Sequence, residues 1–224
     1  MEHSAVPIRE DQSQTPIEVG GTEAAEAVDA LVEREPRVQT LIRPAKVITK
    51  QGEFVCVVRD VSRSGVRVRL FHKLPDEPQM ALQLPNGHQY ELRPVRSCEA
   101  EAAFEFVDSV DVEQLIDETS AYPKRPLRFV LFFPVTVTAN GETWEGVVEN
   151  FSQQGARIEC DGLFAIGQPV RLAGGEGAKA FAEIEARVRW RRDNAYGIVF
   201  DDTFSMHDFA KLCVGLQSPM LAAQ

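Results

Sequence analysis

The chain has 224 residues, of which 44% are hydrophobic and 26% are charged, and its formal net charge is −10 at pH 7. This length fits one large domain or two compact domains of about 100 residues each. No apolar run approaches the roughly 18 residues that a membrane-spanning helix needs, and the net negative charge argues against non-specific binding to a phosphate backbone. We therefore expect a globular protein with no membrane insertion and no nucleic-acid partner.

The N-terminal segment 1–22 is polar, has no hydrophobic period, and predicts a disordered tail. It lacks the basic start and apolar stretch of a secretory signal, so we expect a cytoplasmic protein. Residues 22–35 carry alanine, valine and leucine at helical spacing and predict a short helix. The cysteines form no CxxC pair, which favours small core residues over metal ligands or disulfides. They are Cys56, Cys98, Cys160 and Cys213.

From residue 38 to residue 106 the hydrophobic period changes to two, which predicts strands. Six short runs show it: "VQTLIRPAKVIT", "FVCVVRDV", "GVRVRLF", "MALQLP", "YELRPVRS" and "AAFEF". The Asn86-Gly87 pair between two of them is a strong hairpin signal, because both residues tolerate positive φ. Six strands with hairpin-length connections predict an all-β fold, an antiparallel sheet closed into a small barrel. A short helix is predicted within 108–120.

The second half of the chain repeats this plan. Aligned without a gap at an offset of 90 residues, Pro44 meets Pro134, and a predicted Asn140-Gly141 turn follows the first strand of the second copy. Residues 204–216 have apolar side chains at helical spacing and predict a terminal helix. We therefore expect two tandem six-stranded antiparallel barrels with short flanking helices. The predicted parts are a tail with a short helix at 1–33, a first barrel at 34–120 and a second barrel at 121–224.

One short motif occurs in both halves at the start of the third predicted strand. Its form is an acid or amide, then a serine, then a glycine, written [DN]xSxxG. Ordinary turn chemistry also selects these residues, because Asx side chains bond their own backbone and glycine supplies positive φ. The motif residues are Asp60, Ser62 and Gly65 in the first copy and Asn150, Ser152 and Gly155 in the second.

A group of basic residues precedes the first strand of each barrel. Arg34 and Arg37 stand before the first copy, and Lys124, Arg125 and Arg128 stand before the second. The guanidinium group presents a fixed fork of donors that suits phosphate oxygens and also guanine O6 and N7. A basic arm together with an acceptor turn favours a guanine nucleotide that carries phosphates. Solvated charges on a linker are the simpler alternative.

Each half resembles a PilZ domain, a six-stranded barrel whose signature is RxxxR before the first strand and [DN]xSxxG after the second. The resemblance covers about residues 34–108 and 124–202, and "ARVRWRRDNAYGIVF" also looks like the last two strands of the family. It implies a bacterial receptor for cyclic di-GMP, held as a regulatory ligand with no other cofactor. The implied ligand-binding residues are Arg34, Arg37, Asp60, Ser62 and Gly65 in the first copy, and Lys124, Arg125, Arg128, Asn150, Ser152 and Gly155 in the second.

The chain departs from this signature in both copies. The position that should hold the first arginine of the arm is Glu33 in the first copy and Lys124 in the second. Lysine lacks the bidentate fork, glutamate repels phosphate, and Asn150 offers one acceptor oxygen where aspartate offers two. A tandem barrel that binds no nucleotide and acts as a protein-interaction scaffold is therefore the alternative hypothesis.

No enzyme motif stands out in the sequence. GxSxG, P-loop and HExxH patterns are absent, and the histidines are scattered along the chain, which predicts surface positions. They are His3, His72, His88 and His207. We expect an adaptor, with no catalytic residues and no metal, that acts on an unidentified protein effector. In this hypothesis the ligand changes the orientation of the two barrels about a hinge at "ETSAYPKRP".

Overall fold

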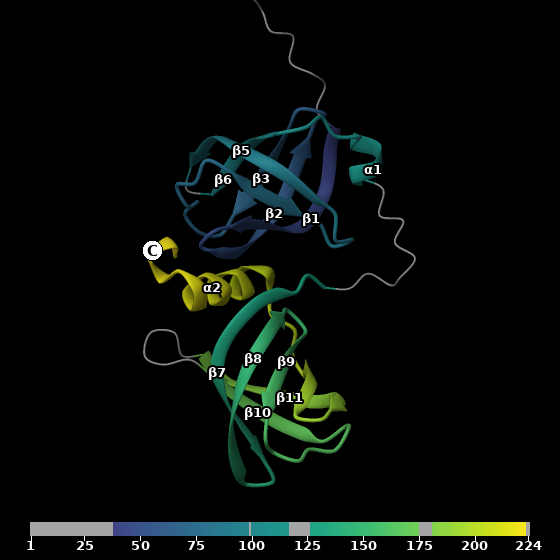
Figure 1. The fold of residues 1–224 in the computed structure, drawn as a ribbon, viewed down its shortest axis with the longest axis vertical. Helices are drawn as coiled ribbons and strands as arrows, with labels where there is room; N and C mark the ends of the chain where they lie inside the picture. Colours follow the sequence, from purple (N-terminus) through teal and green to yellow (C-terminus); the bar gives the residue numbers. More distant parts are fainter. Residues whose placement is uncertain (1–37, 99, 117–125, 175–180, 223–224) are drawn as a thin grey trace, which may run out of the picture. The chain divides into compact units, whose positions relative to one another are not determined.

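The structure, a computed structural model, describes residues 38–98, 100–116, 126–174 and 181–222 (Figure 1). The predicted tail, the N-terminal helix and almost all of the hinge lie outside these residues. So do the basic residues Arg34, Arg37, Lys124 and Arg125. The described part confirms the predicted fold class, since it forms two closed six-stranded antiparallel barrels with few short helices.

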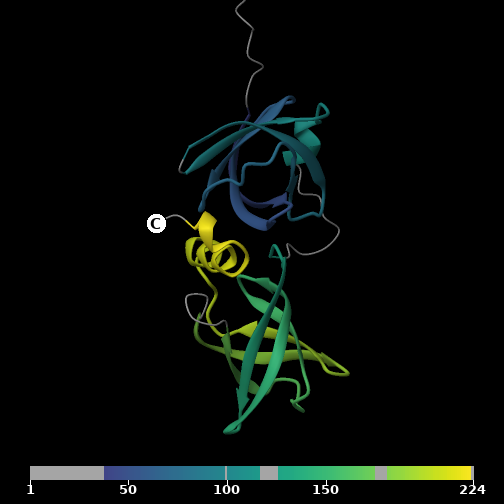
Figure 2. The ribbon, with the colours of Figure 1, turned by 60° about the vertical axis from the view of Figure 1, so that its left-hand side comes forward.

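The first barrel closes because its first strand pairs on both sides, with β2 and with β4. The order of the strands around the barrel is β1-β2-β3-β6-β5-β4, and they form a closed ring in Figure 2. Every pair is antiparallel, as hairpin-length connections require. The strands are β1 (Val38–Thr49), β2 (Gly52–Val61), β3 (Gly65–Leu70), β4 (Met80–Gln83), β5 (Gln89–Cys98) and β6 (Glu101–Phe106).

The core of the first barrel is mostly aliphatic and comes from alternating strand positions. Val47, Val68, Leu82 and Leu92 are all fully buried there. The short helix α1 (Val112–Ile116) adds Leu115 to this core. This confirms the predicted helix after the sixth strand.

The second barrel has the same topology, in the order β10-β11-β12-β9-β8-β7 with β10 paired to β7. Its first hairpin turns at Asn140 and Gly141, whose φ angles of 52° and 84° are both left-handed, as the sequence predicts. Its strands are β7 (Phe129–Ala139), β8 (Glu142–Ser152), β9 (Gly155–Cys160), β10 (Pro169–Gly174), β11 (Phe181–Arg192) and β12 (Ala195–Phe200).

The core of the second barrel contains a cluster of aromatic rings among its aliphatic side chains. The ring of Phe151 stacks on that of Phe209 with centroids 5.9 Å apart, and Phe129 meets Phe209 edge-on at 5.3 Å. The buried hydroxyl of Tyr196 donates a hydrogen bond to the carbonyl of Gly162 at 2.5 Å. The two cores therefore share a topology and differ in their side chains.

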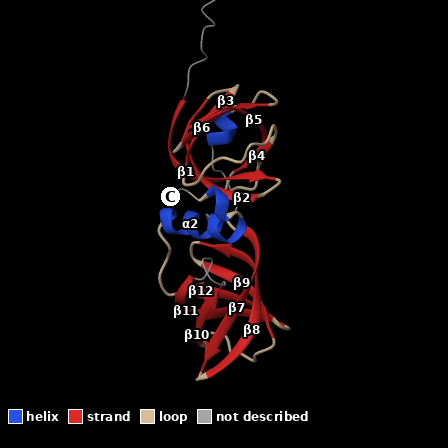
Figure 3. Cartoon of the chain, turned by 90° about the vertical axis from the view of Figure 1, so that its left-hand side faces the viewer, coloured by secondary structure: helices blue, strands red, loops and turns tan. Residues whose placement is uncertain are grey.

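The predicted terminal helix is α2 (Met206–Gln217), shown in blue in Figure 3, and the 3₁₀ turn η2 (Pro219–Leu221) follows it. The Ser205 hydroxyl caps its start by accepting the N–H of Asp208 at 3.1 Å. Its buried face packs into the second core, and its last residue, Gln217, bonds the backbone of β2. Among the described residues no helix is long and apolar enough to cross a membrane.

Two side-chain predictions are wrong. Cys98 is exposed at the end of β5, whereas the other three cysteines are buried as expected. His72 is 1% exposed and stacks near Phe54, with ring centroids 4.7 Å apart. Cys98 ends β5 and His72 lies two residues beyond β3, so the alternation that predicts burial has stopped at both and long-range packing decides.

Candidate functional site

The [DN]xSxxG segments form the turns β2–β3 and β8–β9. The Ser152 hydroxyl donates a hydrogen bond to the carbonyl of Gly155 at 2.9 Å, and the Ser62 hydroxyl accepts one from the N–H of Gly65 at 3.1 Å. Both serines are 5% exposed. The serines therefore stabilise the turns, which is the ordinary role that the sequence also allowed.

The glycines of the motif are required by the close approach of a neighbouring strand. A Cβ atom on Gly155 would collide with the carbonyl of Ile198 in β12, and one on Gly65 would collide with that of Phe104 in β6. A backbone obstacle cannot rotate aside as a side chain can, so no larger residue fits. These contacts press each turn against the edge of the adjoining strand.

A row of residues runs from the motif across four strands of the second barrel. Asn150 of β8 pairs with Arg157 of β9, Arg157 pairs with Gly197 of β12, and Gly197 pairs with Trp190 of β11. Residues directly opposite each other in antiparallel strands project to the same face of the sheet. The row therefore places an amide, a guanidinium, a gap and an indole side by side on the outer surface.

A cavity of about 260 Å³ lies over this row. It brings together four of the residues that the sequence predicts for the second copy, namely Arg128, Asn150, Ser152 and Gly155. Its full lining is Pro126, Arg128, Asn150, Ser152, Gln154, Gly155, Ala156, Arg157, Arg189, Trp190, Gly197, Ile198 and Val199.

The indole of Trp190 lies against the backbone of Gly197. A Cβ atom on Gly197 would collide with Nε1 and the adjoining ring atoms of Trp190, so the glycine leaves the space that the ring fills. The tryptophan remains 40% exposed. A flat ring that is supported on one side and open on the other is a stacking surface for a planar ligand.

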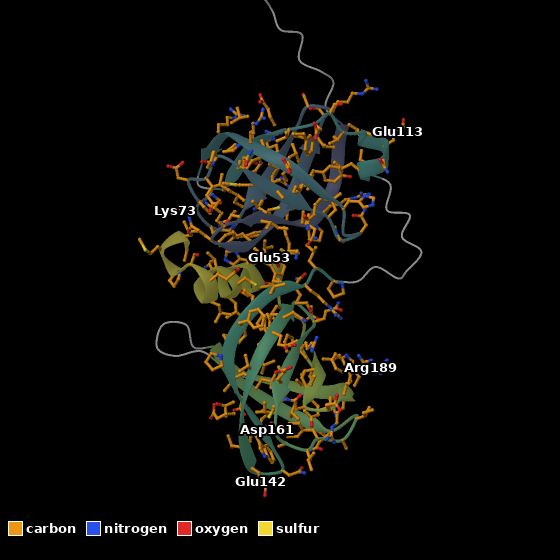
Figure 4. The ribbon with its side chains drawn as sticks, in the orientation of Figure 1. Glu53, Lys73, Glu113, Glu142, Asp161 and Arg189 are labelled. Carbon is orange, nitrogen blue, oxygen red and sulfur yellow. The ribbon has the colours of Figure 1, made fainter. Side chains whose placement is uncertain are left out.

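The cavity is locally basic although the whole chain is acidic. Arg128, Arg157 and Arg189 line it, and no acidic side chain does so among the described residues. Arg189 extends from the second barrel into the solvent in Figure 4. Arg157 is partly neutralised from the side, because its Nε lies 2.6 Å from Oε2 of Glu149. The site can therefore attract an anionic ligand.

The same row in the first barrel is Asp60, Arg67, Ala103 and Arg96. Asp60 is 6% exposed, and its Oδ2 lies 2.6 Å from Nε of Arg67 and also contacts Nη2. The motif carboxylate is thus bound by its own neighbour. A methyl group replaces the gap, and an arginine replaces the indole.

The C-terminal part of the chain, residues 124–213, matches the model of the PilZ domain family. This part of the chain is therefore similar to a PilZ domain. The match includes Arg128, Asn150, Ser152 and Gly155, and it spans the second barrel and most of α2. No curated protein matches the chain significantly.

Several solved structures are similar to the chain at low identity. The PilZ domain of CeSA from a cellulose-synthesizing bacterium is 17% identical, and the match covers 40% of this chain and 94% of that one with a TM-score of 0.32. The Bacillus subtilis inhibitor of motility MotI/DgrA is 14% identical, with coverage of 78% and 96% and a TM-score of 0.35. The Borreliella burgdorferi PlzA protein in complex with c-di-GMP is 11% identical, with coverage of 80% and 88% and a TM-score of 0.33.

The sequence motif does not include several residues that line the cavity of the second barrel. Arg157, Arg189, Trp190 and Gly197 come from strands beyond the motif turn. Arg189, Trp190 and Gly197 lie in "ARVRWRRDNAYGIVF", which the sequence marks only as a segment similar to the last two strands of the family. Its usable signal is the interior glycine of "AYGIVF", since a glycine within a strand often marks a place where another group approaches the backbone.

Proposed function

We propose that the chain is a cyclic di-GMP receptor and that its ligand binds the PilZ domain of the second barrel. The observation that carries this proposal is the basic cavity that Arg128, Asn150 and Trp190 line together. Each of these groups matches a part of the ligand: phosphate, guanine edge and guanine plane. The geometry favours a binding protein over an enzyme.

The phosphates of the ligand would pair with the guanidinium of Arg128, because a charged fork of donors suits anionic oxygens. The carboxamide of Asn150 supplies one acceptor and two donors, which can address a guanine edge. The indole of Trp190 would stack on the base, an interaction worth about 1–3 kcal/mol per base in single-stranded nucleic-acid complexes. Arg128, Asn150 and Trp190 would thus bind the phosphate, the base edge and the base plane of one nucleotide.

The cavity is small for a complete cyclic dinucleotide. At about 260 Å³ it falls just below the range of about 300–1,000 Å³ that is usual for small-molecule sites. One nucleotide half would fill it, and the other half would extend beyond it past Arg128. Lys124 and Arg125 belong to the basic arm by sequence and would add positive charge there.

The first barrel favours the alternative role, that of a scaffold without nucleotide. The Asp60 carboxylate is bound by Arg67, and the position opposite Ala103 is an arginine, Arg96, with no aromatic plane. A ligand would have to displace a charge-assisted pair before it could use the motif acid. We therefore assign the ligand to the second barrel and leave the first with a supporting role.

Ligand binding would signal by shifting a population of arrangements of the two barrels. The arm that binds the phosphates is also the connection between the barrels, so ordering it favours some arrangements over others. The response requires a ligand that binds one arrangement more tightly than another. A cytoplasmic protein effector would then bind the favoured arrangement.

Isothermal titration of cyclic di-GMP into the full chain tests the proposal, with GMP and cyclic di-AMP as ligand controls. We expect saturable binding that is specific for guanine and about tenfold or more weaker in Arg128→Ala, since charged hydrogen bonds contribute about 1.5–3 kcal/mol. The matched control is Arg96→Ala on the first barrel, which should bind as wild type does. Absence of heat and of thermal shift would leave the scaffold hypothesis in place.

A further inference from the structure

We propose that Lys46 and Glu53 of the first barrel are positioning residues for the arm arginine of the second barrel. The proposal rests on the proposed function, because Arg128 is the arm residue that would meet the ligand. The two side chains bond the backbone on either side of Phe129, directly after Arg128. In this view the ligand site of the second barrel depends on the first barrel.

Two hydrogen bonds fix the backbone of the arm. The Nζ of Lys46 donates to the carbonyl of Arg128 at 2.8 Å, and the N–H of Val130 donates to Oε2 of Glu53 at 2.9 Å. The same Lys46 ammonium lies 2.9 Å from the same Glu53 oxygen. One ion pair therefore holds both the carbonyl before Phe129 and the amide after it.

This ion pair is built into the barrel surface and is not a solvent-exposed contact. The side chain of Lys46 is 7% exposed and that of Glu53 is 19% exposed. The ammonium also lies 5.2 Å from the ring centroid of Phe129. A lysine this buried needs anionic and polar partners, and the arm carbonyl is one of them. Removal of the arm contact would therefore leave an ammonium proton without its acceptor.

Glu53 is itself held from behind by the terminal helix. The Gln217 carboxamide accepts the N–H of Glu53 at 2.9 Å and donates to its carbonyl at 2.8 Å, in the manner of a neighbouring strand. Gly52 leaves the space that this side chain needs, because a Cβ atom there would collide with Oε1 of Gln217. The carboxylate that receives the arm thus has a fixed backbone beneath it.

A fixed arm backbone reduces the order that the ligand must impose. Arg128 is exposed, so the position of its backbone decides how its long side chain reaches the cavity. Without the clamp of Lys46 and Glu53, binding must also immobilise the arm, and ordering of flexible groups reduces affinity. Linkage makes the effect reciprocal, so the bound ligand should protect the clamp.

The test compares Lys46→Met with Lys73→Met, an exposed lysine of the same barrel (Figure 4). Affinity for cyclic di-GMP is measured by titration, and hydrogen exchange of the Val130 amide is measured without ligand. We expect Lys46→Met to bind about tenfold more weakly and its Val130 amide to exchange faster, whereas Lys73→Met should match wild type in both. A general loss of stability in Lys46→Met could also weaken binding and speed exchange. A double-mutant cycle with Arg128→Lys is therefore added.

In that cycle, a positioning role predicts non-additivity: Lys46→Met should have little further effect on affinity once Arg128→Lys is present. Equal losses in both backgrounds would overturn the proposal, and so would wild-type affinity or unchanged Val130 exchange in Lys46→Met. If the wild-type chain itself binds no cyclic di-GMP, the proposed function fails. Wild-type binding with an unaffected Lys46→Met variant overturns the clamp alone.

Discussion

Arg67 binds Asp60 through two nitrogen atoms, with Nε 2.6 Å from Oδ2, at the position where the second barrel has Arg157 opposite Asn150. The pair is one-sided in its exposure, since the Asp60 side chain is 9% exposed and that of Arg67 is 39% exposed. In the second barrel the equivalent arginine turns to Glu149 instead. The equivalent rows of the two barrels therefore differ: one holds a closed ion pair, and the other lines an open cavity.

The ion pair of the first barrel should contribute more to stability than its counterpart. Arg67→Met removes the charge partner of a buried carboxylate, and we expect a loss of about 1–3 kcal/mol in the free energy of unfolding. Arg157→Met breaks a more exposed pair and should cost less than about 1 kcal/mol. Urea denaturation followed by intrinsic fluorescence measures both. Equal losses of unfolding free energy in the two variants would show that the buried ion pair of the first barrel stabilises the fold no more than the exposed pair does.

Trp190 should report ligand binding directly. The chain has two tryptophans, so Trp144→Phe leaves Trp190 as the only indole fluorophore. We expect cyclic di-GMP to quench its emission, because a stacked base replaces solvent on the exposed face of the ring. Trp190→Ala should weaken binding by about 1–3 kcal/mol in a titration. Emission that does not change at saturating ligand would place the base elsewhere.

His72 should make stability depend on mildly acidic pH. Burial lowers the pKa of His72 below its usual 6.5, while Nδ1 donates to the carbonyl of Lys73 at 2.7 Å. Below about pH 6.5 the unfolded chain binds a proton at this residue and the folded chain does not. The free energy of unfolding should therefore fall on acidification, by at most about 1.4 kcal/mol per pH unit from this group.

The control for this pH effect is a histidine that is exposed. His72→Phe should flatten the slope of stability between pH 7.5 and pH 5, and His88→Phe should leave it as in wild type, measured by thermal unfolding at a series of pH values. A slope that survives in His72→Phe would assign the acid sensitivity to other groups.

Cysteine reactivity should follow burial. Burial raises the pKa of three thiols and keeps them protonated and unreactive, those of Cys56, Cys160 and Cys213. Cys98 is exposed. Iodoacetamide at pH 8 should therefore modify the native chain once, at Cys98, as intact-mass analysis would show. Cys98→Ser should then remain unmodified; rapid labelling of that variant would mean that a buried thiol becomes accessible.

The strands and hairpins follow from local patterns. Alternating apolar residues predict both barrels, and the Asn140-Gly141 turn is specified by two residues that accept left-handed φ. Because the sequence pattern repeats at an offset of 90 residues, the strands of the second half can also be predicted by comparison with those of the first. The terminal helix also follows from its period, with Phe209 and Cys213 one turn apart on its buried face.

The cavity depends on strand order and register, which no local pattern encodes. Trp190 meets Gly197 because β11 and β12 pair across a bulge, and Arg157 joins them because β9 lies on the other side of β12. The contact of Lys46 with the arm likewise joins segments far apart in the sequence. The motif and its basic arm can be predicted from the sequence, but the further side chains that complete the site cannot.

¹⁵N NMR of the full chain tests the position of the ligand site most directly, because it follows the protein's amide signals as ligand is added. We expect cyclic di-GMP to shift the backbone amide signals of Asn150, Gly155 and Gly197 and the indole N–H signal of Trp190. The amides at the equivalent positions of the first barrel, Asp60, Gly65 and Ala103, should not move. Shifts confined to the first barrel, or no shifts in either barrel, would contradict the assignment of the ligand to the second.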